Sequence, residues 1–156
     1  MILRAACLAA TLAALPFAAQ ASEPDPLVKA QLESREIPFE IDDDGDFQIV
    51  VRLEDDRTQL VWVRSSVQET GSLRVREIWS PGYQSNTDRF PAAIANDLLA
   101  RSNELILGAW VKQDQVAMFV AKIPADASAD QLDEAIDLAA ISADEVELDL
   151  TGKDEL

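Results

Sequence analysis

The stretch EIDDDGDFQIVV, Glu40 to Val51, marks the point where apolar residues begin to alternate along the chain. A period of two places apolar side chains on one face of a β-strand. The alternating residues are Phe39, Ile41, Phe47, Ile49, Val51 and Leu53. Between the two halves, Asp44-Gly45 is a favoured hairpin turn, because both residue types tolerate a positive φ. The stretch therefore predicts two antiparallel strands joined by an acidic turn.

The same stretch has the acidic density of a calcium-binding loop, which is a second interpretation. If Gly45 occupies the sixth position of an EF-hand loop, the twelfth position falls on Val51, where such a loop needs a bidentate glutamate. The flanking segments are also strand-like rather than helical. We therefore expect a structural turn and no tight calcium site. Weak cation binding remains open for Asp42, Asp43, Asp44 and Asp46.

Further strands continue the sheet pattern. The segments QLVWVRSSVQ (59–68) and LRVREIWS (73–80) are predicted strands, bounded by the polar turns EDDRT and ETGS. Pro81-Gly82 and the polar run YQSNTDR are expected to end this group. The segments ELILGAWVK (104–112) and QVAMFVAKI (115–123) form another predicted hairpin. Their nearly continuous apolar sequence is typical of strands that lie centrally, covered on both faces, or at a dimer contact.

Three segments have helical start signals. Asp25 is a capping residue before the first-turn proline Pro26, and a second helix is expected to begin near Pro91. Ser128 and Gln131 have the spacing of a capping box at the start of a third helix. The expected buried faces consist of Leu27, Val28 and Leu32, of Ile94, Leu98 and Leu99, and of Leu132, Ile136, Ala139 and Ala140.

The end of the third helix is left open, because Val146, Leu148 and Leu150 alternate as in a strand. The elements otherwise follow the order helix, three or four strands, helix, two strands, helix. Strands joined by short turns favour antiparallel pairing. The predicted fold class is therefore α+β, an antiparallel sheet with helices packed on it.

The first residues have the composition of a secretory leader. Arg4 precedes an alanine- and leucine-rich run, and the segment 19–21, AQA, is a small-x-small cleavage pattern. We expect cleavage after Ala21. Residues 22–156 would then form a single domain with its core at about residues 26–150.

Composition excludes several classes of chemistry. The only cysteine, Cys7, lies in the expected leader, and the chain has no histidine. The mature chain would therefore have no disulfide, thiolate nucleophile, histidine base or ordinary zinc site. The formal net charge is −16, and loss of Arg4 makes it one unit more negative. Such a charge repels nucleic acid and anionic membranes and favours basic partners or divalent cations.

The sequence contains no recognisable catalytic constellation. Its carboxylate clusters fall in predicted turns and exposed helix ends, whereas acid–base catalysis needs a desolvated group in a cleft. Ser65, Ser66 and Ser102 have no histidine to activate them, and no glycine-rich phosphate loop is present. We expect neither enzymatic activity nor a cofactor. A carboxylate-based hydrolase is a less favoured alternative.

Tryptophans are the best candidates for a binding surface. Trp62, Trp79 and Trp110 fall in predicted strands, where core positions are more common than interface positions. Trp79 is the best exception, because it precedes a loop in which aromatic residues could form an exposed platform. We therefore predict Trp79 and Tyr83 as apolar anchors for a protein or peptide.

The element order and four segments resemble the YbjN family. The segments are IPFEIDDDGDF, LLARSNELILGAW, VAMFVAKIP and SADQLDEAIDLAAISADEVE. The resemblance covers about residues 26–150. It implies the fold that this family shares with the Tir-chaperone-like class I chaperones of type III secretion. It also implies a dimeric binding protein, of a kind described as a candidate sensory-transduction regulator. Its motifs are structural rather than catalytic, and an export signal is a departure from a cytosolic chaperone.

These observations predict an exported, non-catalytic protein- or peptide-binding module with a regulatory role. We expect basic partners and a homodimer formed through Leu105–Val111, Val116–Ile123 and the third helix. A weakly cation-binding acidic structural protein is the alternative. The expected location is a bacterial periplasm or the extracellular space, without membrane insertion. The C-terminal KDEL, Lys153–Leu156, would instead indicate the endoplasmic reticulum lumen in a eukaryote.

Overall fold

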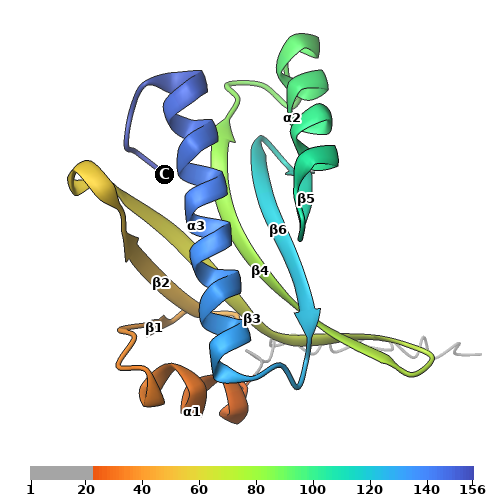
Figure 1. Cartoon of the computed structure of the whole chain (residues 1–156). Helices are drawn as coiled ribbons and strands as arrows, with labels where there is room; N and C mark the ends of the chain where they lie inside the picture. Colours follow the sequence, from red (N-terminus) through yellow and green to blue (C-terminus); the bar gives the residue numbers. More distant parts are fainter. Residues whose placement is uncertain (1–22) are drawn as a thin grey trace, which may run out of the picture.

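The computed structural model describes residues 23–156 (Figure 1). The helices are α1 (Pro26–Ser34), α2 (Ala92–Glu104) and α3 (Ala129–Thr151), and η1 (Glu54–Asp56) is a short 3₁₀ turn. The strands are β1 (Glu40–Ile41), β2 (Phe47–Arg52), β3 (Thr58–Thr70), β4 (Leu73–Gln84), β5 (Ala109–Gln113) and β6 (Val116–Pro124). The predicted leader and its cleavage site lie outside the described residues. No helix within residues 23–156 is long and apolar enough to cross a membrane.

The strands form one antiparallel sheet in the order β1-β2-β3-β4-β6-β5. Hairpins join β1 through β4 in sequence, and another joins β5 to β6. The chain leaves β4 through α2 and returns so that β6, not β5, pairs with β4. The helix α2 therefore lies beside the edge strand β5 (Figure 1). The predicted α+β class and the order of its elements are confirmed.

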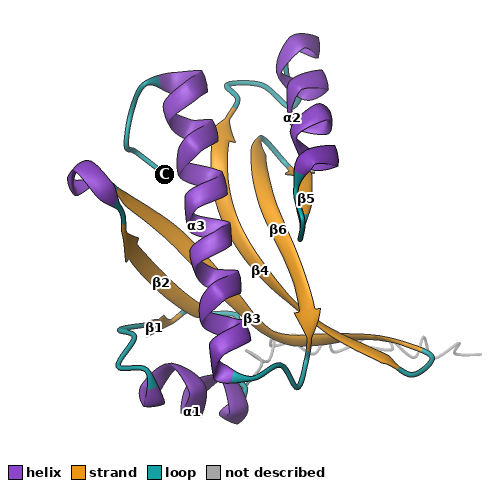
Figure 2. Ribbon diagram, in the orientation of Figure 1, coloured by secondary structure: helices purple, strands orange, loops and turns teal. Residues whose placement is uncertain are grey.

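The long helix α3 covers one face of the sheet, where it packs over β3, β4 and β6 (Figure 2). Small residues line its buried side, so the helix can lie close to the strands. The core between them includes Phe47, Val61, Val63, Ile78, Phe119 and Ala121 from the sheet and Leu132, Ile136, Ala139 and Ala143 from α3. Removal of this apolar surface from water is the main driving force for the fold.

The helix starts are confirmed, but two of the expected buried positions are wrong. The Asp25 carboxylate accepts hydrogen bonds from first-turn amides of α1. Ser128 and Gln131 form both hydrogen bonds of a capping box, 3.3 and 3.0 Å long. Leu27 and Leu99 are 44% and 66% exposed. Both helices lie at the margin of the core, where only a narrow stripe of the helix is covered.

The structure shows where the third helix ends, which the sequence did not settle. The helix continues to Thr151, and its buried residues include Val146 and Glu147. Gly152 then adopts a φ of +67° and donates its N–H to Leu148 O at 2.9 Å. A left-handed glycine is a common helix terminator, because it has no Cβ to clash. Val146 lies on the buried side of the helix and Leu148 on its exposed side, so the alternation of apolar residues here does not indicate a strand.

Strand β4 continues through the position where Pro81-Gly82 was expected to end it. Its pairing with β6 shifts register between Pro81 and Tyr83, which indicates a β-bulge. A bulge tolerates a proline, which has no N–H to donate to the ladder. The predicted end of the strand at Ser80 is therefore wrong.

The second predicted hairpin is present with a shorter first strand. Strand β5 begins at Ala109, so the segment 105–108 is a connection rather than part of the strand. Ile106 in that connection is fully exposed. Strand β6 lies between β4 and β5, which confirms its central position, whereas β5 is an edge strand.

Candidate functional site

The face of the sheet opposite α3 carries partly exposed aromatic side chains. Side chains alternate along a strand, so residues between core positions point to this second face. Trp62 on β3 lies directly opposite Trp79 on β4, and Trp79 lies opposite Val120 on β6. None of these three belongs to the core beneath α3. We name this surface the tryptophan face and define it by Trp62, Arg64, Glu77, Trp79, Pro81, Met118, Val120 and Lys122.

A hollow with a volume of about 380 Å³ opens on the tryptophan face. Its apolar lining consists of Trp62, Trp79, Pro81, Val116 and Met118. Its polar lining consists of Asp42, Asp44, Arg64, Gln113 and Asp114. Both tryptophans are partly exposed. The hollow therefore combines accessible indole rings with carboxylates from two different turns. Among the described residues 23–156, Arg64 is the one basic residue in its lining.

Charged neighbours fix the position of Trp79. The Arg64 guanidinium lies over the indole, 5.2 Å from the ring centroid, in a cation–π contact. The indole Nε1 donates to Glu77 Oε2 at 3.0 Å, and the other oxygen of Glu77 pairs with Lys122 Nζ at 2.8 Å. Because the polar atom of the indole is already paired, the exposed part of the ring is an apolar contact surface.

Tyr83, the second predicted anchor, lies on the opposite face of the sheet. In a regular strand, positions 79 and 83 would point to the same side. The bulge between Pro81 and Tyr83 adds a residue and reverses the direction of Tyr83, which pairs with the core residue Ala117. Its ring packs edge-to-face on Phe90, with centroids 5.7 Å apart. The structure therefore separates Trp79 from Tyr83 and places Trp62 beside Trp79 instead.

Trp110 belongs to the core, in line with the usual position of a strand tryptophan. It is 8% exposed and packs edge-to-face on Phe119, with centroids 5.8 Å apart. Its outer edge contributes to a second hollow of about 440 Å³ between α2 and β5, together with Phe90 and Leu98. Of the three tryptophans, only Trp62 and Trp79 therefore contribute to the tryptophan face.

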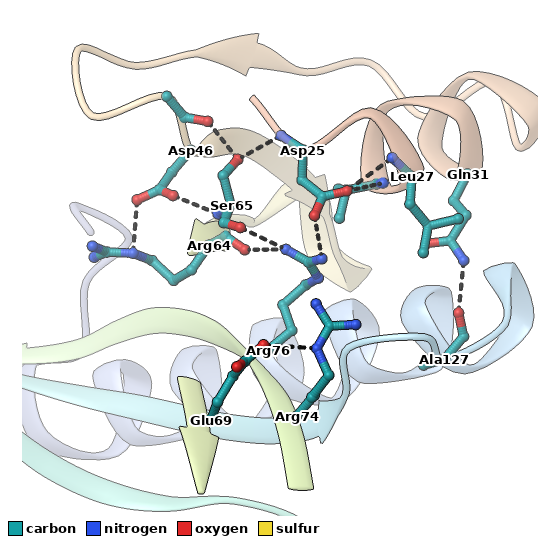
Figure 3. Close-up of polar contacts among 12 residues, drawn as sticks. Asp25, Leu27, Gln31, Asp46, Arg64, Ser65, Glu69, Arg74, Arg76 and Ala127 are labelled. Carbon is teal, nitrogen blue, oxygen red and sulfur yellow. Dashed lines mark hydrogen bonds and ion pairs between the residues drawn. The ribbon is translucent and has the colours of Figure 1, made fainter. Parts of the chain in front are cut away.

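A polar network holds the acidic turn between β1 and β2 (Figure 3). The side chain of Asp46 is buried, its Oδ1 accepts from Ser65 N at 2.6 Å, and its Oδ2 pairs with Arg64 Nε at 2.7 Å. Ser65 Oγ donates to Gly45 O at 2.6 Å. Burial raises the pKa of Asp46, although Ser65 and Arg64 oppose this effect. The turn is therefore anchored to β3 next to the tryptophan face.

Arg76 extends this network to α1. Its Nη1 donates to Arg64 O at 2.7 Å and Ser65 O at 3.1 Å, and its Nη2 pairs with Asp25 Oδ2 at 2.7 Å (Figure 3). The Arg76 side chain is 3% exposed. Burial alone would raise the pKa of Asp25, but the hydrogen bond and charge of Arg76 lower it below its ordinary value. Helix α1, the acidic turn and β3 are therefore one connected unit.

The acidic turn has a different geometry from the expected two-residue turn. Gly45 has a φ of +81°, whereas Asp44 is not among the residues with positive φ. Asp42 Oδ1 accepts hydrogen bonds from Asp44 N and Asp46 N, at 3.0 and 2.9 Å. The weak cation candidates Asp42 and Asp46 thus direct carboxylate oxygens at backbone amides and at Arg64. Such contacts give the turn a structural role.

Comparison with known proteins bears on this domain as a whole. The chain matches the model of the YbjN family, described as "Putative bacterial sensory transduction regulator", over residues 24–150. The chain belongs to the YbjN family. The match runs from just before α1 almost to the end of α3 and includes the tryptophan face. No curated protein matches the chain. The family description supports a non-catalytic regulatory module for this YbjN domain.

Proposed function

We propose that this YbjN domain is a binding module that holds a basic protein or peptide segment against the tryptophan face. The observation that carries the proposal is the direct pairing of Trp62 with Trp79 on the sheet face opposite α3. Tryptophan is enriched among residues that dominate binding energy, because a large rigid ring loses little entropy on contact. Two such rings side by side provide an apolar contact for an extended segment.

The charges around the hollow favour a basic segment. Asp42, Asp44 and Asp114 contribute carboxylates to its lining, and Arg64 is already paired with Asp46. The chain as a whole has a formal net charge of −16. A field of this sign accelerates encounters with basic partners and slows encounters with acidic ones. Lysine and arginine side chains can also stack on the indole rings.

A binding role accounts for the buried carboxylates better than a hydrolase does. The buried acidic residues are Asp46, Glu77 and Glu147, and they belong to different elements. Asp46 and Glu77 are each paired with a cation, and Glu147 accepts backbone amides. A general acid or base needs a proton-transfer path to a substrate. Each of these carboxylates instead has at least one oxygen held by a structural partner.

We also propose export and a homodimer for this module. Asp25, just after the predicted cut at Ala21, already caps α1 and pairs with Arg76, so cleavage there would leave these contacts intact. Ile106 and Val111 leave apolar surface exposed at the edge formed by β5 and the connection before it. Exposed apolar surface at a sheet edge is a common site of self-association.

Site-specific photocrosslinking in the native host tests the binding surface. A photoreactive residue at Val50, 62% exposed and on the same face as Trp62, should capture a partner. The matched control is Leu148 on α3, which is 47% exposed. The yield of partner crosslinked from position 50 should fall sharply when Trp79 is replaced by alanine, and also when salt is added. Equal capture from both positions, or capture unaffected by Trp79→Ala, would exclude the tryptophan face as the binding surface.

A further inference from the structure

Three carboxylates converge where the chain returns after α3. Asp144 and Glu147 lie on α3, and Asp154 lies in the segment that follows it. One carboxylate oxygen from each residue lies within 4.8 Å of one from each of the others. Among residues 23–156, this is the one group of three or more acidic side chains with such spacing. Like charges at this distance repel one another unless a cation lies among them.

Each of the three carboxylates uses one oxygen for a contact within the protein. Asp144 Oδ1 pairs with Arg57 Nε at 2.6 Å, and Asp154 Oδ1 accepts from Thr58 N at 3.2 Å. Glu147 Oε1 accepts from the amides of residues 155 and 156, at 2.7 and 3.1 Å. These contacts position all three groups. Their second oxygens, Asp144 Oδ2, Glu147 Oε2 and Asp154 Oδ2, remain available as ligands.

The Glu147 side chain supplies an independent sign of a missing partner. Glu147 is 1% exposed, and within residues 23–156 its buried Oε2 atom has no hydrogen-bond partner. A buried polar atom without a partner is costly, and such atoms are uncommon in native proteins. The unpartnered atom at Glu147 belongs to one of the three converging carboxylates. A bound cation would satisfy it directly.

The net charge of these side chains favours binding of a divalent cation. In the part of the chain that the structure describes, Arg57 is the one cation in contact with these carboxylates. Its Nη2 also donates to Lys153 O at 3.0 Å. One guanidinium and three carboxylates give the group a formal net charge of +1 − 3 = −2.

We propose that Asp144, Glu147 and Asp154 form a binding site for one hard divalent cation, Ca²⁺ or Mg²⁺. Oxygen ligands from carboxylates, completed by water or a backbone carbonyl, are the set that these ions prefer. The site is distinct from the acidic turn at residues 42–46 and does not depend on the binding role of the tryptophan face. Since Glu147 and Asp154 come from α3 and the segment after it, the ion fastens residues 152–156 to the domain.

Calorimetric titration of the chelator-treated full chain with CaCl₂ and, separately, MgCl₂ tests the site. Wild type should bind one ion per chain. Asp154→Asn keeps an oxygen for Thr58 N but removes a charged ligand, so it should weaken binding roughly tenfold or more. Glu147→Gln should weaken it at least as much. Asp149→Asn, an exposed α3 aspartate paired with Arg101, is the matched control and should bind as wild type does.

Amide hydrogen exchange provides a second readout that does not depend on these variants. Added Ca²⁺ should slow exchange at the amides of Glu155 and Leu156, which donate to Glu147. It should leave the acidic turn at residues 42–46 unchanged. The proposal is overturned if wild type binds neither ion at millimolar concentration, or if Asp154→Asn and Glu147→Gln both bind as tightly as wild type. Protection confined to residues 42–46 would also overturn it.

Discussion

Gly82 lies against the indole of Trp110, so closely that a Cβ at position 82 would be 2.4 Å from the Cη2 atom of the ring. The same Cβ would be 3.1 Å from Ala143 O on α3. The bulge in β4, the core tryptophan of β5 and the central helix therefore meet at one residue without a side chain. This contact explains why a glycine occupies a strand interior, where it is otherwise unfavourable.

The first prediction is that Gly82→Ala destabilises the domain by about 1–3 kcal/mol, the usual cost of overpacking a core. Urea denaturation should show a lower midpoint with an unchanged slope. Trp110→Phe removes the indole atoms nearest to position 82. A double-mutant cycle should therefore give a favourable coupling between the two changes. Strict additivity would show that the close contact does not determine the cost.

The second prediction concerns the buried ion pair of Asp25 and Arg76. Asp25→Asn keeps an N-capping oxygen but leaves Arg76 buried without a negative partner, which should cost about 2–4 kcal/mol. The pKa of Asp25 is lowered in the folded state. The stability it contributes is therefore fully present above its ordinary pKa of 3.8 and is lost as the pH falls through the lower folded value.

Thermal unfolding at several pH values measures this effect. The difference in unfolding free energy between wild type and Asp25→Asn should be constant near neutrality and should shrink below pH 3.8. Asp97→Asn, which breaks a partly exposed ion pair with Arg101, is a suitable control, because it should change stability by less than about 1 kcal/mol. A difference between wild type and Asp25→Asn that persists unchanged in acid would contradict the assignment.

The third prediction concerns Asp46, whose effect on the pH dependence of stability is opposite to that of Asp25. Burial raises the folded pKa of Asp46 above its ordinary value of 3.8. The contribution of Asp46 to stability is therefore fully present below that value and is lost as the pH rises through the raised folded pKa. Asp46→Asn should remove this fall in stability. Chemical denaturation of the two proteins between pH 3 and pH 7 provides the comparison. If the stability of the two proteins depends on pH in the same way, then Asp46 has the same pKa in the folded and unfolded states, and the prediction is wrong.

The fourth prediction concerns assembly at the β5 edge. Ile106 lies beside an apolar groove of about 650 Å³ whose lining includes Leu107, Ile123 and Leu138. If this region forms the dimer contact, Ile106→Asp should shift the protein to a monomer in light scattering. Leu73→Asp is the matched control, since Leu73 is 65% exposed at the β3–β4 turn. A wild-type monomer at high concentration, or equal effects of both changes, would exclude this contact.

Local patterns were sufficient to predict most of the fold. The Asp25 cap, the Ser128–Gln131 capping box and the hairpins depend on interactions within a few residues, so the sequence displays them directly. The end of α3 was less clear, because a helix buried on one side can show an apparent alternation over a short segment. Strand β4 continues past Pro81 through a bulge. The bulge depends on pairing with a neighbouring strand, so the local sequence does not show it.

The candidate site was harder to predict, because it depends on sheet register. Hairpin pairing alone places Trp62 and Trp79 on one face, and the register shift between Val63 and Val67 brings them directly opposite each other. A different shift follows Pro81, where β4 has one extra residue against β6, and it separates Tyr83 from the two tryptophans. The carboxylate group of α3 could not be foreseen, since Asp154 reaches it only when the chain turns back after Gly152.

The last prediction tests the sign of the charge on the partner. Arg64 lines the hollow on the tryptophan face as a basic residue, and its guanidinium covers part of Trp79. Arg64→Gln should therefore make the hollow more negative and expose more of the indole. A short peptide of alternating lysine and leucine is a suitable probe. Its affinity should rise roughly fivefold, about 1 kcal/mol, at low salt, and the gain should shrink at high salt.

Two controls separate charge from a change in fold. Arg64→Lys keeps the positive charge and should leave the affinity for the lysine peptide close to the wild-type value. A peptide with glutamate in place of lysine should bind weakly to all three proteins. Arg64→Gln also removes the partner of the buried Asp46, so its folded state is checked by circular dichroism before titration. If the lysine peptide binds more weakly to Arg64→Gln while the fold is intact, the proposed preference for a basic segment is contradicted.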